Sequence, residues 1–462
     1  LLCLKIRKKK ARSIEMVTGS LWKNIILFSI PLMCSQLLEV LFNLSDVAVV
    51  GRFADYKALG AVGSTTLLVT LFVGFLIGMG SGVNVRVAHA LGAGKHKDTV
   101  ETVHTALLLC MMMGLLIGAV CFFFSGRMLM LLHTKDDLIG QASLYLKIYA
   151  IGLPAMGIYN FGNGVLSARG ETKRPLYYLA IAGVLNVILN LFFVIVLHMA
   201  AAGVATATAI AQYVSAGLIL IHLLRRKDEC RVSLKDIRFH RHAAISILML
   251  GIPAGIQNAI FAIANLFVQT GVNSFDTVMV SGSTAATNAD TLIFNVMYAF
   301  YTGCSSFMSQ NYGARNKKRV LKSYFISLFY SFTTGLILGL LLFILVISSC
   351  LCSPQTQRLL MPACRELRSW PFHIVCPLLW TAQLQHPAVL ENRHSYDHYH
   401  SGILCFPYCL DLHHFCLDSY NSGIIPSVSL LMDHHIYRRN HLFHNNLQEA
   451  VILYIYFFFS SY

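Results

Sequence analysis

The chain has 462 residues, of which 56% are hydrophobic and only 12% are charged, and its formal net charge is +15. Because an ordinary soluble domain carries roughly 25% charged residues, this composition excludes the soluble classes. Nine apolar segments are long enough to cross the roughly 30 Å hydrocarbon core of a bilayer. In chain order they are 24–50, 59–85, 102–124, 141–167, 176–198, 202–224, 243–270, 278–308 and 322–349.

The apolar segments are predicted to be helices, because lipid offers the backbone no hydrogen-bond partner. Of the 30 Lys and Arg residues before position 350, 25 lie in the N-terminal segment or in the connections after even-numbered segments. This asymmetry predicts a multi-pass protein of the cell inner (plasma) membrane with its N-terminus in the cytoplasm. Nucleic-acid binding is not expected, since the basic residues alternate between loops instead of lining one face.

An internal repeat organises the chain. Ser29-Ile30-Pro31 opens one copy and Gly251-Ile252-Pro253 opens the other, 222 residues later. Each copy ends in a similar motif, and the two motifs are 221 residues apart. They begin with Leu91-Gly92-Ala93 and Tyr312-Gly313-Ala314. Duplicated blocks of this kind build many secondary transporters, with the substrate path between the halves. The predicted fold is an all-α polytopic membrane protein whose two six-helix lobes are related by a pseudo-twofold axis along the membrane normal.

The predicted organisation has five parts. They are a basic cytoplasmic N-terminus (1–23), an N-lobe (24–225), a cytoplasmic linker (226–242), the first three helices of a C-lobe (243–350) and a degenerate tail (351–462). No secretory signal peptide is expected, and Met16 is a candidate natural start. The 13 scattered cysteines argue against a disulfide framework.

The tail 351–462 lacks a clean apolar run of spanning length, and it holds 11 of the 19 histidines and 7 of the 11 prolines. Isoleucine codons read one nucleotide out of register give His, Tyr and Ser codons. We therefore hypothesise that a frameshift near position 350 replaced the last three helices, which the nucleotide sequence would test directly. A zinc site is the alternative, but the histidines spread through the tail without a repeated ligand pattern. Its candidate ligands are Cys409, His413, His414 and Cys416.

Asp46 lies deep within the first apolar segment, where a charge costs several kcal/mol and marks a functional site. A partly desolvated carboxylate there could bind and release a proton near physiological pH, or coordinate sodium. The alternative is a structural pair with Arg52 near the outer interface. Glu39 precedes Asp46 by seven residues, so it lies on a similar helix face and is predicted to line the substrate cavity.

Asn186 and Asn190 share one face of the segment 176–198, because they are four residues apart. They are predicted to contact Asp46 or its bound cation, which makes these three residues the predicted cation-coupling site. Hydrogen bonding between helices is the alternative role.

Further polar residues within the apolar segments are candidates for the cavity lining. For Thr206 and its neighbour Thr208 simple packing is favoured, and Asp290 is the only carboxylate in the readable C-lobe segments. Besides Glu39, the predicted lining residues are Asn163, Thr206, Gln257 and Asp290. The glycines of the second segment are predicted to be close-packing positions; they are Gly74, Gly78, Gly80 and Gly82. The HExxH and G-x-S-x-G motifs are absent, so no enzyme is expected.

These residues resemble the multidrug and toxic compound extrusion (MATE) family, in particular its DinF-like and MepA-like bacterial branch. The resemblance covers about residues 17–350, and its marks occur in the same order in both halves. They are Asp46–Arg52, Ala58–Ser64, Leu91–Gly94, Gly251–Gln257 and Ser309–Ala314.

The resemblance implies a twelve-helix transporter that exports cationic or amphipathic compounds in exchange for H⁺ or Na⁺, with no further cofactor and no obligate protein partner. Asp46 matches the family's coupling aspartate and Asn186 a family asparagine. Asn190 stands where some members carry aspartate, and Phe261 lies near an acidic position of the NorM branch, so the choice of ion stays open. A lipid-precursor flippase and a non-functional frameshifted product are the alternatives.

Overall fold

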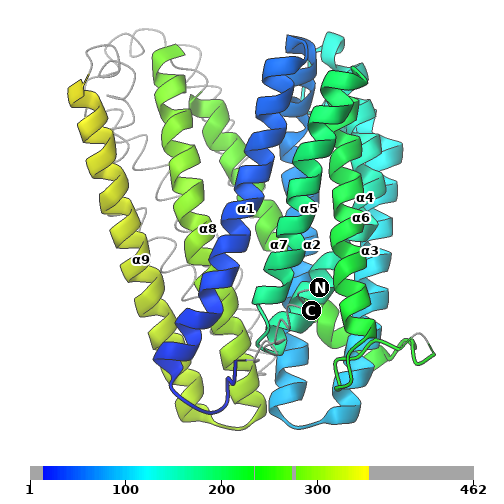
Figure 1. Cartoon of the computed structure of the whole chain (residues 1–462), viewed down its shortest axis with the longest axis vertical. Helices are drawn as coiled ribbons and strands as arrows, with labels where there is room; N and C mark the ends of the chain where they lie inside the picture. Colours follow the sequence, from blue (N-terminus) through cyan, green and yellow to red (C-terminus); the bar gives the residue numbers. More distant parts are fainter. Residues whose placement is uncertain (1–13, 234, 273–276, 353–462) are drawn as a thin grey trace, which may run out of the picture. The chain divides into compact units, whose positions relative to one another are not determined.

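The computed structural model describes residues 14–233, 235–272 and 277–352, and within these ranges the long elements are helices (Figure 1). They are α1 (Leu21–Phe53), α2 (Tyr56–Gly92), α3 (His96–Leu131), α4 (Asp136–Ala168), α5 (Lys173–Leu191), the π-helical turn η1 (Phe192–Val196), α6 (Ala200–Leu224), α7 (Arg241–Val272), α8 (Thr277–Gly313) and α9 (Lys317–Cys352). Eight of the nine predicted spans lie inside a single helix, and the span 176–198 is divided between α5 and η1. The predicted tail 351–462 lies outside the described residues, apart from its first two positions.

Seven of the described helices are long and apolar enough to cross a membrane. They are α1, α2, α3, α5 with η1, α6, α7 and α9. The 33-residue α4 is not among them, because polar residues such as Lys147 and Asn160 interrupt its apolar sequence. The chain is therefore a multi-pass, all-α membrane protein, in agreement with the predicted class.

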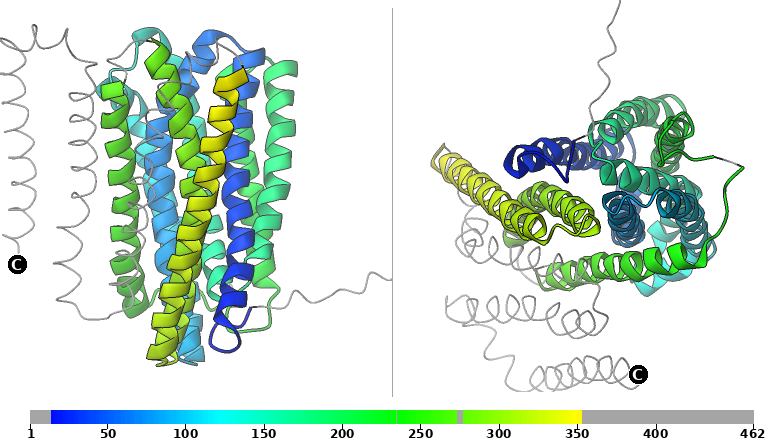
Figure 2. Two further views of the ribbon diagram at one scale, coloured as in Figure 1. Left: turned by 90° about the vertical axis from the view of Figure 1, so that its left-hand side faces the viewer. Right: turned by 90° about the horizontal axis from the view of Figure 1, so that it is seen from below.

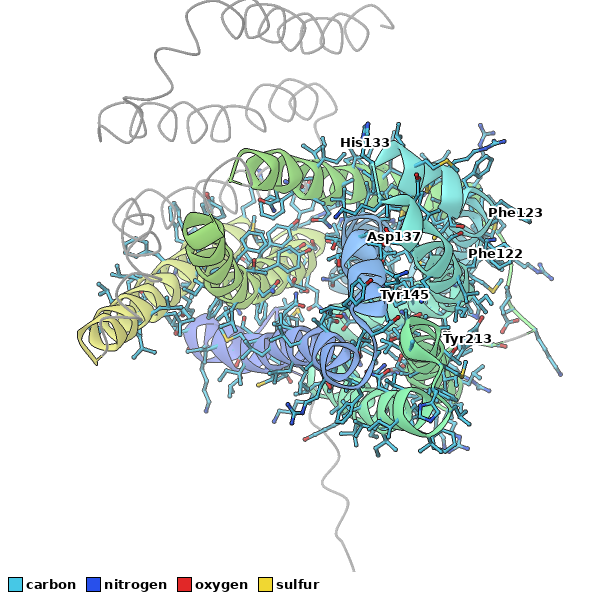
Figure 3. The ribbon with its side chains drawn as sticks, turned by 90° about the horizontal axis from the view of Figure 1, so that it is seen from above. Phe122, Phe123, His133, Asp137, Tyr145 and Tyr213 are labelled. Atoms are coloured by element: carbon cyan, nitrogen blue, oxygen red, sulfur yellow. The ribbon has the colours of Figure 1, made fainter. Side chains whose placement is uncertain are left out.

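Helix α4 is central to the packing of α1–α6, since it contacts α2, α3 and α6 along its length. Its Tyr145 points inward among these helices and is 6% exposed, whereas Phe123 of α3 points outward and is 76% exposed (Figure 3). An outer surface of exposed aromatic and aliphatic side chains is what a hydrocarbon environment stabilises. The internal core of this half is therefore separated from its lipid-facing surface.

Glycines bring α2 directly against α7; the sequence predicted close-packing positions or hinges here, but not the partner helix. A Cβ atom on Gly82 would lie 2.7 Å from the backbone nitrogen of Gly251, and one on Gly78 would collide with Gly255. Gly80 packs in the same way on α4, where a Cβ would lie 3.0 Å from the carbonyl oxygen of Asn160. The first half of the chain is thus joined to the second at backbone contact distance, which only glycine permits.

Helices α2 and α8, the corresponding helices of the two repeats, lie side by side (Figure 2). Asn84 Nδ2 donates to Ser306 Oγ at 2.9 Å, and the same hydroxyl donates to Asn84 Oδ1 at 3.1 Å. These residues are 222 positions apart, one more than the 221-residue offset between the ends of α2 and α8. Both are buried, so this pair is a water-shielded hydrogen-bonded contact between the two repeats.

Residues 14–20, which precede α1 and are called the strap below, cross the end of the bundle where the α4–α5 turn and the last turns of α8 lie. Ile14 N donates to the Gly170 carbonyl at 3.1 Å, which ties the strap to the α4–α5 turn. Asn311 of α8 donates to the Met16 carbonyl at 3.1 Å, and Arg319 of α9 donates to the Gly19 carbonyl at 3.0 Å. The strap is therefore hydrogen-bonded to both repeats.

Candidate cation-coupling site

Four polar side chains from three helices form a closed hydrogen-bonded ring. Asn190 Nδ2 donates to Asp46 Oδ1 at 2.5 Å, and Thr208 Oγ1 donates to Asp46 Oδ2 at 3.3 Å. Asn186 links these two donors, since it accepts from Asn190 Nδ2 at 3.2 Å and donates to Thr208 Oγ1 at 3.2 Å. The predicted coupling residues Asp46, Asn186 and Asn190 are thus brought together, with Thr208 as a fourth member.

The ring is buried within the first repeat. Asp46 is 9% exposed and Asn190 is fully buried. Helix α1 supplies the carboxylate because it contacts both α5 and α6, and the two asparagines project from one face of α5. Directly after Asn190, α5 passes into the π-helical turn η1, an irregularity that occurs frequently at functional sites.

Both hydrogen bonds to the carboxylate are donated to it, so this arrangement suits an ionised Asp46. A proton on Asp46 would place a donor against the Asn190 amide and the Thr208 hydroxyl, and at least one of them would have to reorient. Alternatively, a sodium ion would find oxygen ligands here, because Asn190 Oδ1 is buried and accepts no hydrogen bond. Either cation would change the geometry of the ring.

The structure does not support the alternative role of Asp46 as the partner of Arg52 in an ion pair. Among the described residues Arg52 is not within ion-pair distance of Asp46, and it lies exposed on the last turn of α1. The carboxylate instead faces α5 and α6.

The other predicted residues lie apart from the ring. Glu39 lies close enough to Tyr149, Tyr159 and Tyr298 to interact with each electrostatically. Thr206 donates to the carbonyl of Ala202 at 2.8 Å, within its own helix, so it is Thr208 that reaches Asp46.

Three more of the predicted lining residues remain unassigned. Asn163 is half-buried, and Gln257 is 8% exposed with its Nε2 unpaired. The side chain of Asp290 lies outside the described residues.

Within the described ranges, no three His, Cys, Asp or Glu side chains gather as metal ligands. The zinc alternative concerned the tail, which is outside those ranges.

The ring predicts a difference between two neighbouring threonines. Thr208→Val removes a donor to Asp46 while it keeps the side-chain shape, so we expect the apparent affinity for the coupling cation to change about 3- to 10-fold. Thr206→Val is the matched control, because Thr206 bonds only to its own helix. The measurement is the cation dependence of substrate export in reconstituted vesicles. Equal effects of the two substitutions would contradict the ring.

Comparison with known proteins identifies the family. The MatE family model matches residues 31–192 and 253–362, which together are more than half of the chain. The chain belongs to the MATE family. The two matched segments correspond to the two repeats, and the match to the second MATE repeat ends at residue 362.

Several MATE relatives are named as multidrug transporters. The chain is 31% identical to the probable multidrug resistance protein YpnP of Bacillus subtilis over 309 residues, which are 67% of this chain and 69% of the relative. It is 22% identical to the multidrug export protein MepA of Staphylococcus saprophyticus over 54% of this chain and 55% of that protein.

A solved MATE structure described as the straight conformation has the same fold. Its TM-score is 0.76 at 20% identity, over 85% of this chain and 87% of that one.

Proposed function

We propose that this MATE protein is an antiporter that exports organic cations in exchange for H⁺ or Na⁺, with the Asp46 ring as its coupling site. The observation that carries the proposal is the buried ring, which holds a carboxylate that can take up one cation. The names of its relatives support export of drugs. A cation that binds one conformation of the transporter better than the other shifts the balance between them.

The proposed mechanism is alternating access between the two repeats. The glycine contacts of α2 with α7 and the Asn84–Ser306 pair hold the repeats together. Binding of the coupling cation at Asp46 reorients the ring, which lies between α1, α5 and α6. Because α1 also contacts α8 of the other repeat, we infer that α1 transmits this change between the halves.

Aromatic side chains near Glu39 support an organic cation as substrate. Phe261 and Phe294 stack with their ring centroids 5.2 Å apart, and Tyr298 continues the row at 6.3 Å from Phe294. Tyr298 also interacts electrostatically with Glu39. A carboxylate beside stacked rings provides both charge complementarity and cation–π surface for a planar cation.

Glu39→Gln should therefore act on cationic substrates specifically. We expect KM for a planar monovalent cation such as ethidium to rise about tenfold, the effect of losing roughly 1.4 kcal/mol of charge interaction. Transport of a neutral substrate by the same variant is the internal control. A variant that transports cationic and neutral compounds with unchanged KM would remove Glu39 from substrate recognition.

The proposed orientation places the N-terminus and the α2–α3, α4–α5, α6–α7 and α8–α9 connections in the cytoplasm of a cell whose inner membrane holds the protein. It rests on the excess of Lys and Arg in these segments. Cysteine-free variants that carry one new cysteine in the α3–α4 or the α4–α5 connection would test it by labelling with a membrane-impermeant thiol reagent.

A lipid-precursor flippase is less well supported. Such a protein would need a basic lining for an anionic headgroup, but few Lys or Arg lie in or next to the predicted spans, and Arg86, directly after the second span, is the clearest candidate. Arg86 is paired with Asp98 at 2.6 Å, so its charge is already compensated. A lipid-linked sugar transport assay would discriminate between the two functions.

The direct test of the proposal uses purified protein in sealed vesicles. An imposed proton gradient or an imposed sodium gradient should drive movement of ethidium against its own gradient, and the gradient that is effective identifies the coupling ion. Movement that is independent of both gradients would overturn the proposed coupling.

A further inference from the structure

A cavity of about 510 Å³ lies apart from the coupling site, at the end of the bundle where the strap crosses. Its walls are the strap, the first two turns of α1 and the α4–α5 turn with the start of α5. Hydrogen bonds hold these walls together, since Asn24 Nδ2 donates to the Glu15 carbonyl at 2.8 Å and Ile14 N donates to the Gly170 carbonyl. A side chain at Gly170, whose φ is +86°, would collide with the Ile14 carbonyl.

The lining carries three basic side chains, Lys23, Lys173 and Arg174, and two carboxylates, Glu15 and Glu171. Glu171 is already shared between Arg226, at 2.9 Å, and Arg174, at 3.1 Å. Lys23 and Lys173 line the cavity from α1 and α5, and neither is in an ion pair within the part of the chain that the structure describes. Glu15 accepts a hydrogen bond from Thr18 and is in no ion pair among the described residues, so the lining keeps a net positive charge of one. Its two ammonium groups that are free of ion pairs are suited to an anion such as a phosphate.

Each of these lysines stands at the base of an exposed apolar stripe. On α5, Lys173 is followed at four-residue intervals by Tyr177 and Ile181, which are 60% and 54% exposed. On α1, Lys23 is followed by Leu27, which also lines the cavity, and then by Ile30; they are 42% and 48% exposed. Residues four apart share a helix face, and α1 contacts α5, so the two stripes rise from one cavity.

We propose that this cavity binds the headgroup of an anionic phospholipid, with its acyl chains along the stripes of α1 and α5. Phosphate is the chemistry that the two lysines recognise, and the adjoining apolar stripes favour a lipid over a soluble phosphate compound. The inference rests on the proposed orientation, because the cytoplasmic leaflet is the one rich in anionic lipid. Since the strap is also bonded to Asn311 and Arg319, a bound lipid would stabilise the arrangement in which the two repeats meet at this end.

Native mass spectrometry of the purified protein from phosphatidylcholine vesicles with and without phosphatidylglycerol tests the proposal. The wild type should retain phosphatidylglycerol in preference to phosphatidylcholine, and the double variant Lys23→Gln/Lys173→Gln should weaken this binding about tenfold or more. The matched control is Lys135→Gln/Lys147→Gln, which makes the same change of charge at two exposed lysines outside the cavity. The control should bind phosphatidylglycerol as the wild type does.

Two results would overturn the proposal. One is equal loss of phosphatidylglycerol from the cavity and control variants, since it would mean that general surface charge accounts for the binding. The other is displacement of the lipid by millimolar glycerol 3-phosphate or inorganic phosphate, which would identify a site for a soluble phosphate compound. Lipid retention is measured without a gradient or a substrate, so its outcome is independent of whether Asp46 couples transport.

Discussion

Replacing Asp46 by Asn should abolish export driven by an ion gradient, with a loss on the order of 100-fold, the upper part of the usual range for coupling between two sites. Asparagine keeps the size of the side chain, but it carries no charge and cannot take up a proton. The amide nitrogen of the new asparagine would also be a hydrogen-bond donor that faces two other donors, the Asn190 amide and the Thr208 hydroxyl. Ethidium export from vesicles with an imposed proton or sodium gradient is the measurement.

The matched control is Asp137→Asn, which removes one carboxylate from the exposed first turn of α4 (Figure 3). It should leave gradient-driven export unchanged. Binding of ethidium to the Asp46→Asn protein should persist without a gradient, because Asp46 is assigned to coupling. An Asp46→Asn protein that still concentrates ethidium against its gradient would eliminate the ring as the coupling site.

Substituting Gly82 by Ala should destabilise the packed arrangement of the repeats by about 1–3 kcal/mol, the usual cost of overpacking. The new Cβ would lie 2.7 Å from Gly251 N and 2.9 Å from the Ile247 carbonyl oxygen, and neither backbone atom can move independently of α7. We expect a lower melting temperature in detergent and faster amide hydrogen exchange in the parts of α2 and α7 that face each other.

Gly63→Ala provides the control within the same helix, because a Cβ at Gly63 meets no atom within 4 Å. It should leave the melting temperature and the exchange rates unchanged or slightly improved, since alanine favours the helix. If both alanines had the same effect, helix propensity and not the α2–α7 contact would control the stability.

Local sequence was sufficient to predict the helices, because spans of apolar residues can only be helical in lipid. Their ends were predicted less well. Helix α3 continues to Leu131, several residues beyond the apolar run, since backbone hydrogen bonding does not stop where hydrophobicity falls. The turn η1 was missed altogether, because Phe192–Val196 is as apolar as the residues before it.

The ring was predicted in part. Asp46 stood out as a charge within a span, and the four-residue spacing of Asn186 and Asn190 placed both amides on one face. The choice between Thr206 and Thr208 depends on how α6 is rotated about its axis relative to α1, which is a property of tertiary packing. The repeat was readable in the sequence, yet nothing local indicated that Asn84 and Ser306 would meet.

The Asn84–Ser306 contact joins α2 to α8, the corresponding helix of the other repeat, and so resembles an isologous interface, in which the same element of two copies meets across a twofold axis. A side chain in that position must both donate and accept, because two identical donors or two identical acceptors would leave each other unsatisfied. Asparagine and serine both satisfy this requirement. The α2–α8 contact within this single chain therefore resembles a homodimer interface in its hydrogen bonding. The residue on either helix can change to another that both donates and accepts without a loss of hydrogen bonds.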